Sequence, residues 1–572
     1  MPDMPRGPDD AEEFVGATMA GKPDLIVHGG DLPATARALR DLFAGAGYLL
    51  DRDMPVKLVQ PADGGPMLAN RLTVNNVVVE AHRLCRPVKL LGDKGERTPV
   101  TLPERVARMY LDMVGEWNLP PLAGISTAPL LAPDGSIRDA VGYDPASGLW
   151  CCKVPSLHLP ECPRREDAEA SLRVLREAFK TFPFADGVRR YDSALRAEVT
   201  DLGHSPGRDE SAMLAALMTA ICRATLSLAP GFLAVAPQVS GAGSGKGLLV
   251  RAICIIAFGI RPRAFTAGHD RQELDKRIVA ELVEAAPALF LDNVNGAVLR
   301  SATLASVLTE RPARVRLLGL SRMVVLNSTA FVAVTGNGLR VSEDLARRFL
   351  LCELDARCED PETRPFASGF LDEIERRRPE LLAATVTIWQ YGRQNASQLK
   401  RGRPFGSFET WCEWVRDPLL TLGCRDPVER VERVKAQDPQ RQQVAELFQA
   451  WDEHHGAAPI KAADLAYPVQ RIIDPQDRGR QYIAARLGNL AGTRTAGFVL
   501  TRQEAAGTWG AATYALRQTA PEAPEGTGHR DHRDRRASET APDGPMPPML
   551  PMPGAVEGED AAFGDEETVW TD

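Results

Sequence analysis

The stretch from Pro230 to Phe258 constrains the fold of this chain more than any other. It reads PGFLAVAPQVSGAGSGKGLLVRAICIIAF, an apolar segment, a glycine-rich turn and a second apolar segment. The first segment predicts a buried strand, and the second predicts a buried helix that begins near Gly247. Glycines allow the turn to direct several backbone N–H groups at one point, and Lys246 adds a positive charge there. With the positive end of the helix dipole, this turn predicts a site for the β- and γ-phosphates of a nucleotide.

The turn departs from the phosphate-loop pattern G-x-x-x-x-G-K-[ST] at two positions. Ser240 stands where the first glycine is expected, and Gly247 replaces the hydroxyl residue that would contact Mg²⁺. A flexible Gly/Ser turn without a ligand is the alternative, but the apolar strand before the turn and the Gly-Lys pair at the helix start favour the phosphate site. The residues expected to bind ATP are Gly241, Ala242, Gly243, Ser244, Gly245, Lys246 and Gly247.

Two further apolar runs end in polar residues. Asp292 follows Leu289–Leu291, and Asn337 ends the run TAFVAVTGN. Nucleotide sites of open α/β sheets lie at the carboxyl ends of the strands, so we expect Asp292 to hold Mg²⁺ and Asn337 to contact the γ-phosphate or the attacking water. Asn293 stands where a glutamate would polarise that water. An amide orients water but cannot accept its proton, so hydrolysis needs another carboxylate, Asp292 itself or Glu273, or is slow.

Arginines outside the turn are candidates for contacts with DNA or with a neighbouring subunit. Residues 311–326 alternate charged and apolar residues around a glycine, which predicts a β-hairpin that presents Arg314, Arg316 and Arg322. A solvated hairpin face explains the same pattern equally well. The segment SEDLARRFLLCELD predicts a helix capped by Ser342. Its Arg347 and Arg348 are either surface charges or reach a neighbour's nucleotide as an arginine finger.

The regions on either side carry weaker signals. The N-terminal part mixes short β-like runs, LIVHG, GYLLD, VKLVQ and NVVVE, with helices expected at Leu32–Ala44 and Leu102–Val114. Near the C-terminus, helices expected at Gln442–His454, Lys461–Arg471 and Gln481–Gly492 precede two β-like runs. Three helices and a wing favour a winged-helix-like module whose candidate DNA contacts include Arg486 and Arg494. A small helical oligomerisation domain is the alternative.

Charge is distributed unevenly along the 572 residues. Residues 519–572 hold thirteen acidic residues against four arginines, and residues 1–20 hold five against one, so the remaining body carries +5 although the whole chain carries −8. A basic body suits phosphate contacts, while the acidic tail is suited to bind partner proteins or to compete with DNA. No apolar run is long and uncharged enough to cross a bilayer and no secretory signal is evident, so we expect a cytoplasmic protein without membrane contact. The ten cysteines are scattered and are expected to be reduced.

The ordered motifs SGAGSGKG, LFLDNVNG, a basic hairpin, AVTGNG and DLARRF resemble the ATPase core of AAA+ enzymes. Within that group they are similar to superfamily 3-like helicases of phages and integrated mobile elements, the phage primase-helicase type. The resemblance implies that Lys246 is the Walker A phosphate ligand, that Asp292 is the Walker B carboxylate, and that Asn337 is the sensor 1 residue. It implies that Arg347 or Arg348 acts on a neighbouring subunit, and that the basic hairpin tracks DNA.

These expectations combine into a multidomain chain. Its parts are a disordered segment 1–20, an α+β N-terminal domain 21–160, a helical linker region 161–229, a central α/β P-loop ATPase core of AAA+-like type 230–357, a helical lid 358–425, a winged-helix-like domain 439–518 and a disordered acidic tail 519–572. The expected function is an ATP- and Mg²⁺-dependent DNA helicase or translocase for phage or mobile-element replication, acting on single-stranded or forked DNA as a homo-oligomeric ring, a hexamer by analogy. The alternative is an ATP-switched DNA-binding initiator or loader with weak or no hydrolysis. A P-loop regulator unrelated to replication is the third reading.

Overall fold

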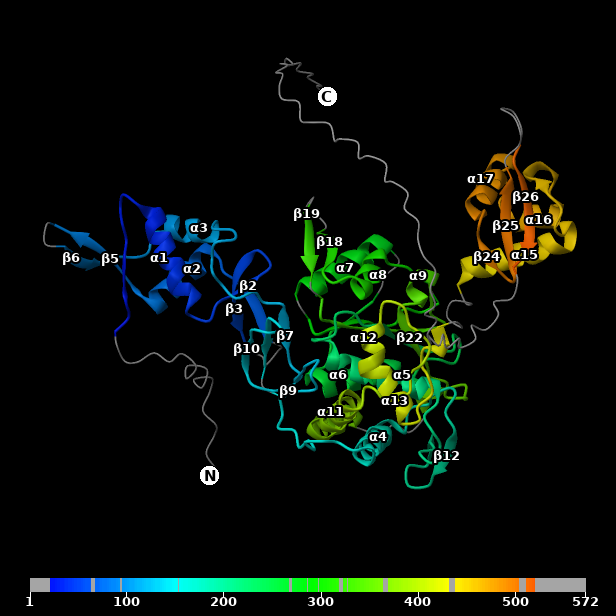
Figure 1. Ribbon diagram of the computed structural model, residues 1–572, viewed down its shortest axis with the longest axis horizontal. Helices are drawn as coiled ribbons and strands as arrows, with labels where there is room; N and C mark the ends of the chain where they lie inside the picture. Colours follow the sequence, from blue (N-terminus) through cyan, green and yellow to red (C-terminus); the bar gives the residue numbers. More distant parts are fainter. Residues whose placement is uncertain are drawn as a thin grey trace, which may run out of the picture. The chain divides into compact units, whose positions relative to one another are not determined.

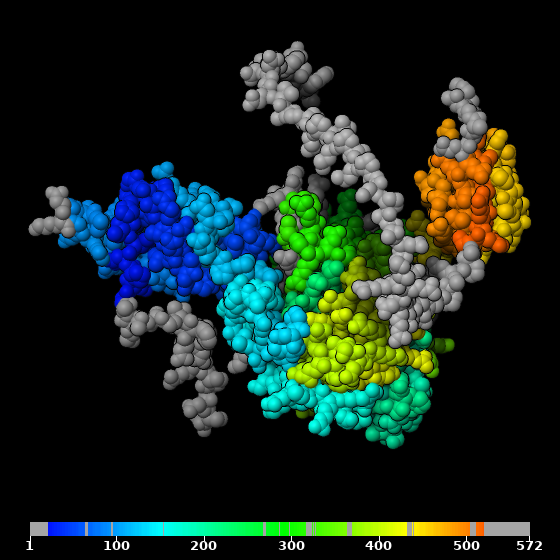
Figure 2. Space-filling view, viewed as in Figure 1, coloured from blue at the N-terminus to red at the C-terminus, as the bar shows by residue number. Residues whose placement is uncertain are grey.

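The computed structural model describes residues 21–62, 67–92, 95–152, 154–266, 270–284, 286–296, 298–317, 322–326, 328–363, 369–431, 438–503 and 511–519 (Figures 1 and 2). The segments expected to be disordered, 1–20 and all of the acidic tail after residue 519, lie outside these residues. Within the described ranges, no helix is long and apolar enough to cross a membrane.

The N-terminal region is a small α+β unit with its own hydrophobic core. One sheet has the order β1-β5-β6 and the other the order β2-β3-β4. The elements are β1 (Asp24–Ile26), α1 (Leu32–Ala44), β2 (Leu49–Asp51), β3 (Met54–Val59), β4 (Leu68–Arg71), α2 (Val74–Leu84), β5 (Arg86–Leu91), β6 (Glu96–Pro99) and α3 (Glu104–Leu111). Helix α1 has the bounds that the sequence predicts.

The run NVVVE, expected as a strand, lies inside helix α2, so that prediction is wrong. Thr73 and Asn76 form a capping box that starts the helix: the Asn76 backbone N–H donates to Thr73 Oγ1, and the Thr73 N–H donates to Asn76 Oδ1. Val77 and Ala81, four residues apart, then share the buried face. A good cap and a helical burial pattern outweigh the strand preference of three consecutive valines.

Short hairpins follow. Strands β8 (Leu130–Leu131) and β9 (Ile137–Arg138) pair antiparallel, as do β10 (Gly142–Asp144) and β11 (Leu149–Cys151). Strand β11 also pairs in parallel with β7 (Gly124–Ser126). Helix α4 (Arg165–Phe179), the hairpin of β12 (Arg189–Asp192) and β13 (Ala197–Thr200), and helix α5 (Arg208–Cys222) come next. Helix α5 is buried along almost its whole length, because it lies in the core of the central sheet.

The central sheet has five parallel strands in the order β15-β16-β20-β14-β22. These are β14 (Gly231–Ala236), β15 (Ala264–Phe265), β16 (Ala288–Leu291), β20 (Phe331–Asn337) and β22 (Phe349–Glu353). Side chains alternate between two cores. One core contains α5 and α6 (Lys246–Phe258) with Phe232 and Phe290, and the other contains α7 (Arg271–Val283) and α8 (Ala302–Thr309) with Leu233 and Leu291. Helices on both faces explain why the strands are apolar without interruption.

The helix expected from Ser342 through FLLCE is wrong in its second half. Helix α9 covers only Glu343–Ala346, and Phe349–Glu353 is strand β22, which pairs with β14. Four consecutive residues from Phe349 are buried, as in a strand covered on both faces. Ser342 precedes the helix, but its side chain makes no capping hydrogen bond; the Glu343 N–H donates to Asp438 instead.

The rest of the described chain is helical and then mixed. Helices α10 (Phe370–Arg376) and α11 (Arg378–Gln394) pack on α6, and α12 (Glu409–Trp411), a π-helical turn at Cys412–Arg416 and α13 (Asp417–Thr421) follow. The C-terminal region holds α15 (Pro439–His455), α16 (Tyr467–Ile473) and α17 (Arg480–Leu490) with a sheet of order β23-β26-β25-β24. Its strands are β23 (Ile460–Lys461), β24 (Arg494–Thr495), β25 (Phe498–Gln503) and β26 (Thr513–Gln518). The helix expected from Lys461 begins only at Tyr467, because β23 pairs with β26 before it.

Candidate nucleotide site

The turn between β14 and α6 has the tight backbone that its glycines predict. Gly243 and Gly245 have φ values of +70° and +93°, which L side chains rarely adopt. A Cβ atom at Gly241 would lie 2.1 Å from the Pro237 carbonyl oxygen, and one at Gly243 would lie 2.6 Å from the Glu362 backbone nitrogen. The turn therefore has no room for a side chain at Gly241, where it packs against its own backbone, or at Gly243, where Glu362 packs against it.

Lys246 begins α6 and turns its side chain back into the turn. Its Nζ atom donates to the Gly241 carbonyl oxygen at 2.7 Å and to Ser244 Oγ at 3.0 Å, and Ser244 Oγ donates to the same carbonyl. The residue is 7% exposed. Burial lowers the pKa of Lys246 to about 8, and the Asp292 carboxylate acts in the opposite direction.

Asp292 follows β16 at the carboxyl edge of the sheet, as predicted. Its Oδ1 accepts a hydrogen bond from Thr335 Oγ1 on the neighbouring strand β20 at 2.5 Å. Its Oδ2 accepts from Arg251 Nη2 at 3.2 Å. A Cβ atom at Gly247 would lie 3.4 Å from Oδ2, so the start of α6 and the end of β16 meet at this carboxylate.

Asn337 ends β20 and faces the phosphate turn. It pairs in register with Ala236, the last residue of β14, and its Oδ1 would lie 2.7 Å from a Cβ atom at Gly241. Among the described residues, this buried oxygen has no hydrogen-bond partner. An amide oxygen without a partner is costly when buried, and it marks a position where a water or ligand donor would be favourable. The side chains predicted from three separate segments, Lys246, Asp292 and Asn337, thus meet at one edge.

Asn293 is exposed and has a φ of +61°, in the left-handed region that asparagine adopts more readily than most residues other than glycine. Its N–H donates to Thr335 Oγ1. Asn293 directly follows Asp292, and its side chain is exposed to solvent at the edge of the site. Glu273, considered as an alternative base, lies on the exposed side of α7 and pairs there with Lys276 and Arg277.

Arg347 and Arg348 both pair with Asp344 on the short helix α9. The Arg348 carbonyl oxygen accepts from the N–H of Gly231, the first residue of β14. The phosphate turn follows the last residue of that strand, about 20 Å away at 3.3 Å per residue. These arginines therefore lie at the opposite edge of the sheet and do not complete the site of their own chain. A role on a neighbouring subunit stays a prediction.

The predicted basic hairpin is present as β18 (Ala313–Leu317) and β19 (Arg322–Leu326), paired antiparallel. Arg314 is exposed and pairs with Val325, and Met323 and Val325 are exposed apolar residues of the second strand. The side chains of Arg316 and Arg322 lie outside what the structure describes.

Two arginines hold the base of this hairpin. The fully buried guanidinium of Arg223, at the end of α5, donates to the carbonyl oxygens of Leu226, Ser328 and Ala330. Arg311 donates to the Leu226 carbonyl oxygen at 2.6 Å. Both the chain entering the hairpin and the chain leaving it are thus bonded to the segment 223–226, which directly follows α5.

The C-terminal arginines occupy two different environments. Arg486 lies on α17 and is partly buried, while Arg494 is exposed in β24. Their contacts with DNA stay predictions.

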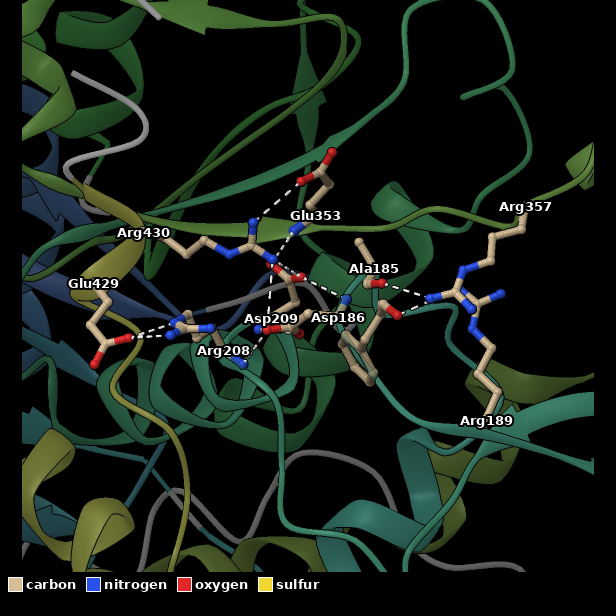
Figure 3. A network of polar contacts seen from close by, with 10 residues as sticks. Ala185, Asp186, Arg189, Arg208, Asp209, Glu353, Arg357, Glu429 and Arg430 are labelled. Carbon is tan, nitrogen blue, oxygen red and sulfur yellow. Dashed lines mark hydrogen bonds and ion pairs between the residues drawn. The ribbon is translucent and has the colours of Figure 1, made fainter. Parts of the chain in front are cut away.

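A charge network braces the strand next to the phosphate strand (Figure 3). Arg430 lies among Asp209, Asp186 and Glu353, and Glu353 ends β22 beside Val235 of β14. The Glu353 N–H donates to Asp209 Oδ1 at 2.9 Å. The network borders a cavity of 570 Å³, lined by Ala185, Asp186, Arg208, Glu353, Glu429 and Arg430. Burial, followed by the Asp186 charge, raises the pKa of Asp209 to about 7.

Sequence reasoning missed Arg251, Thr335 and Glu362 at this site. Arg251 looks like one polar position on an apolar helix, and Glu362 comes near the turn only through the fold. Thr335 was recognisable as a polar strand end beside Asn337, but its bond to Asp292 depends on which strands are neighbours.

The donor set at Asp292 fits Mg²⁺ poorly. Both carboxylate oxygens already accept hydrogen bonds, one from a guanidinium, and Gly247 supplies no hydroxyl. Magnesium requires nearly octahedral oxygen ligands and is bound by carboxylates that are free to face it. Among the described residues, no group of three or more His, Cys, Asp and Glu side chains is placed to hold a metal.

No family model matches this chain. No curated protein matches it either. Among solved structures, it is similar at 12% identity to the A form apo structure of the NrS-1 C-terminal region, with a TM-score of 0.36, over 84% of this chain and 99% of that one. It is similar at 10% identity to the SCCmec type IV Cch active helicase, with a TM-score of 0.31, over 82% of this chain and 92% of that one.

Proposed function

We propose that the chain is an ATPase that acts on DNA, as a helicase or translocase in the replication of a phage or mobile element. The meeting of Lys246, Asp292 and Asn337 at the carboxyl edge of a parallel sheet supports this proposal most directly. These side chains come from positions almost a hundred residues apart. The Lys246 ammonium and the Asn337 amide suit a triphosphate directly, and the Asp292 carboxylate is paired with the Arg251 guanidinium beside it.

In this proposal the phosphates take the place of the Gly241 carbonyl oxygen as the partner of Lys246. The backbone N–H groups of the turn and the N-terminus of α6 bind the same anion. Asn337 donates from its amide NH₂ to the γ-phosphate, or its amide oxygen accepts a hydrogen bond from the attacking water, a donor that this oxygen lacks within the described chain.

The oligomeric part of the proposal concerns Arg347 and Arg348. Because they lie at the far edge of the sheet from their own phosphate turn, they suit a nucleotide bound by the next subunit of a ring. Single-stranded DNA would contact the β18–β19 hairpin, whose exposed face combines Arg314 with apolar side chains.

A second function, an ATP-switched initiator or loader that hydrolyses ATP slowly or not at all, is favoured by Asn293. This residue stands where a glutamate would activate water, and an amide cannot accept the proton. Such a protein would bind ATP and assemble on DNA without unwinding it.

Steady-state ATPase measurements with and without single-stranded DNA separate the two functions. A motor turns over faster with DNA, and a switch binds ATP with little turnover in either condition. Lys246→Ala should abolish nucleotide binding, while Lys89→Ala, a change of an exposed lysine in the N-terminal unit, should leave it unchanged. Unchanged binding by Lys246→Ala would show that the phosphate site is wrong.

A further inference from the structure

Arg251 occupies the space that a hydroxyl residue and a metal ion would need. It lies four residues after Gly247, one turn further along the same face of α6. A Cβ atom at Gly247 would lie 2.6 Å from Arg251 Nη1. The guanidinium thus fills the volume left by the missing side chain, directly beside Asp292.

The guanidinium is held there from two sides. Arg251 Nη2 donates to Asp292 Oδ2 at 3.2 Å, and the Cζ atom lies 5.3 Å from the centre of the buried Phe290 ring, a cation–π contact. Thr335 fixes the other oxygen of Asp292. The Arg251 side chain is still 32% exposed, and its Nη1 atom lies next to Gly247 at the end of the phosphate turn.

We propose that Arg251 takes the place of Mg²⁺ at this site, so that the chain binds a nucleoside triphosphate without a divalent cation. This inference rests on the proposed phosphate site. It goes further by identifying the Arg251 guanidinium as the cation that neutralises the phosphates. A guanidinium has five N–H donors in a planar fork, so it can pair with the Asp292 carboxylate and also donate to phosphate oxygens.

Charge balance supports the same assignment. A triphosphate beside an unpaired carboxylate would be repelled, and metal ions usually relieve that repulsion in such sites. Here the fixed positive charge of Arg251 already neutralises Asp292, and Lys246 adds a second positive charge within the turn. A metal ion would have to displace a charged hydrogen-bonded partner and would gain no hydroxyl ligand from Gly247.

The test is the affinity of the full chain for a fluorescent ATP analogue, measured in excess Mg²⁺ and in excess EDTA. The wild type should bind in both, with dissociation constants that differ by less than about threefold. Arg251→Ala should weaken binding in EDTA by about tenfold or more, the value of a lost charge-assisted hydrogen bond. Arg173→Ala, on the exposed face of α4, is the matched arginine control and should change neither value.

A double variant, Gly247→Thr with Arg251→Ala, should convert the site to metal dependence. Gly247 does not have a positive φ, and once Arg251 is shortened the nearest contacts of a new Cβ are the Asp292 oxygens at 3.4 Å and 3.5 Å, which are ordinary distances. The added hydroxyl and the released carboxylate then offer two oxygen ligands. This variant should bind the analogue well in Mg²⁺ and at least about tenfold more weakly in EDTA.

The outcomes distinguish this inference from the proposed function. If the wild type binds in Mg²⁺ and loses that binding in EDTA, the phosphate site stands and the role of Arg251 is wrong. If the wild type binds in neither condition, or if Lys246→Ala binds as well as the wild type, the nucleotide site itself is wrong. The EDTA comparison on the wild type needs no variant, so it decides the question even where a substitution prevents folding.

Discussion

The Nζ atom of Lys246 lies 2.7 Å from the carbonyl oxygen of Gly241, five residues earlier in the same turn. The lysine is thus bound to its own loop, and a phosphate would replace a backbone carbonyl as its partner. Exchange of a neutral acceptor for a charged one is favourable only while the lysine is protonated.

ATP affinity should therefore fall at alkaline pH. Burial lowers the pKa of Lys246 to about 8, so the ammonium is present below that pH and is lost above it. Bound phosphates keep Lys246 protonated, so binding above pH 8 requires uptake of a proton. The dissociation constant should therefore rise up to about tenfold per pH unit above pH 8. Lys246→Arg keeps its charge and should show a flat profile in the same fluorescence titration. A flat profile for the wild type as well would contradict this assignment.

Gly241→Ala should disrupt the turn. The new Cβ would lie 2.1 Å from the Pro237 carbonyl oxygen and 2.7 Å from Asn337 Oδ1, so the backbone must move away from both. We expect a loss of about 1–3 kcal/mol in the free energy of unfolding, as for other overpacked positions, together with loss of nucleotide binding. Thermal unfolding and ATP titration measure the two effects. Gly45→Ala, where nothing lies within 4 Å, is the control and should change neither.

Asp209→Asn should change how stability depends on pH. The pKa of Asp209 is raised from 3.8 to about 7 by burial, so the folded chain binds a proton that the unfolded chain releases between these values. This contribution is fully present below pH 3.8 and is lost as pH rises through 7. The difference in melting temperature between the wild type and Asp209→Asn should therefore shift against the wild type as pH rises from about 4 to about 7.

The matched control for that measurement is Asp201→Asn. The pKa of Asp201 is lowered, mainly by the hydrogen bond from the Gly203 N–H, so its contribution is present above the unfolded pKa and is lost at acid pH. The wild type should not lose stability relative to Asp201→Asn as pH rises from about 4 to about 7. Parallel curves for both variants would argue that Asp209 is ionised in the folded chain.

Arg314→Ala should weaken binding of single-stranded DNA and lower its salt dependence. One lost phosphate contact reduces the slope of log K against log[salt] by about 0.7 for single strands. Arg108→Ala, which removes an exposed arginine paired with Glu104 on α3, should leave the slope unchanged. Fluorescence anisotropy with a labelled oligonucleotide at several salt concentrations gives both slopes. Equal slopes for all three proteins would place the DNA elsewhere.

The sequence predicts the strands and helices around the phosphate turn well, because each has a strong local pattern. Helix α6 begins one residue before the expected Gly247, and β16 and β20 begin and end within a few residues of the predicted runs. Strand β22 was missed because DLARRF continues the helical pattern up to Phe349, and only pairing with β14 makes FLLCE a strand. The local conformational preference of these residues carries no information about the neighbouring strand β14.

In the candidate site, too, some residues can be predicted from the sequence and others cannot. Lys246, Asp292 and Asn337 are recognisable because each ends or begins an apolar run at the sheet edge. The absence of a hydroxyl at Gly247 is also visible in the sequence. The residue that fills the resulting space, Arg251, is not, because its approach to Asp292 depends on how α6 packs against β16.

The arginines beneath the β18–β19 hairpin limit how it can respond to events at the nucleotide. Arg223 and Arg311 bond both of its ends to the segment 223–226 that directly follows α5. If this hairpin moves DNA, its far end must therefore rotate while the two ends fixed by these arginines keep their positions. Distance labels on the strands near the hairpin end would report such a rotation, whereas labels beside Ser328 and Leu226 would stay still.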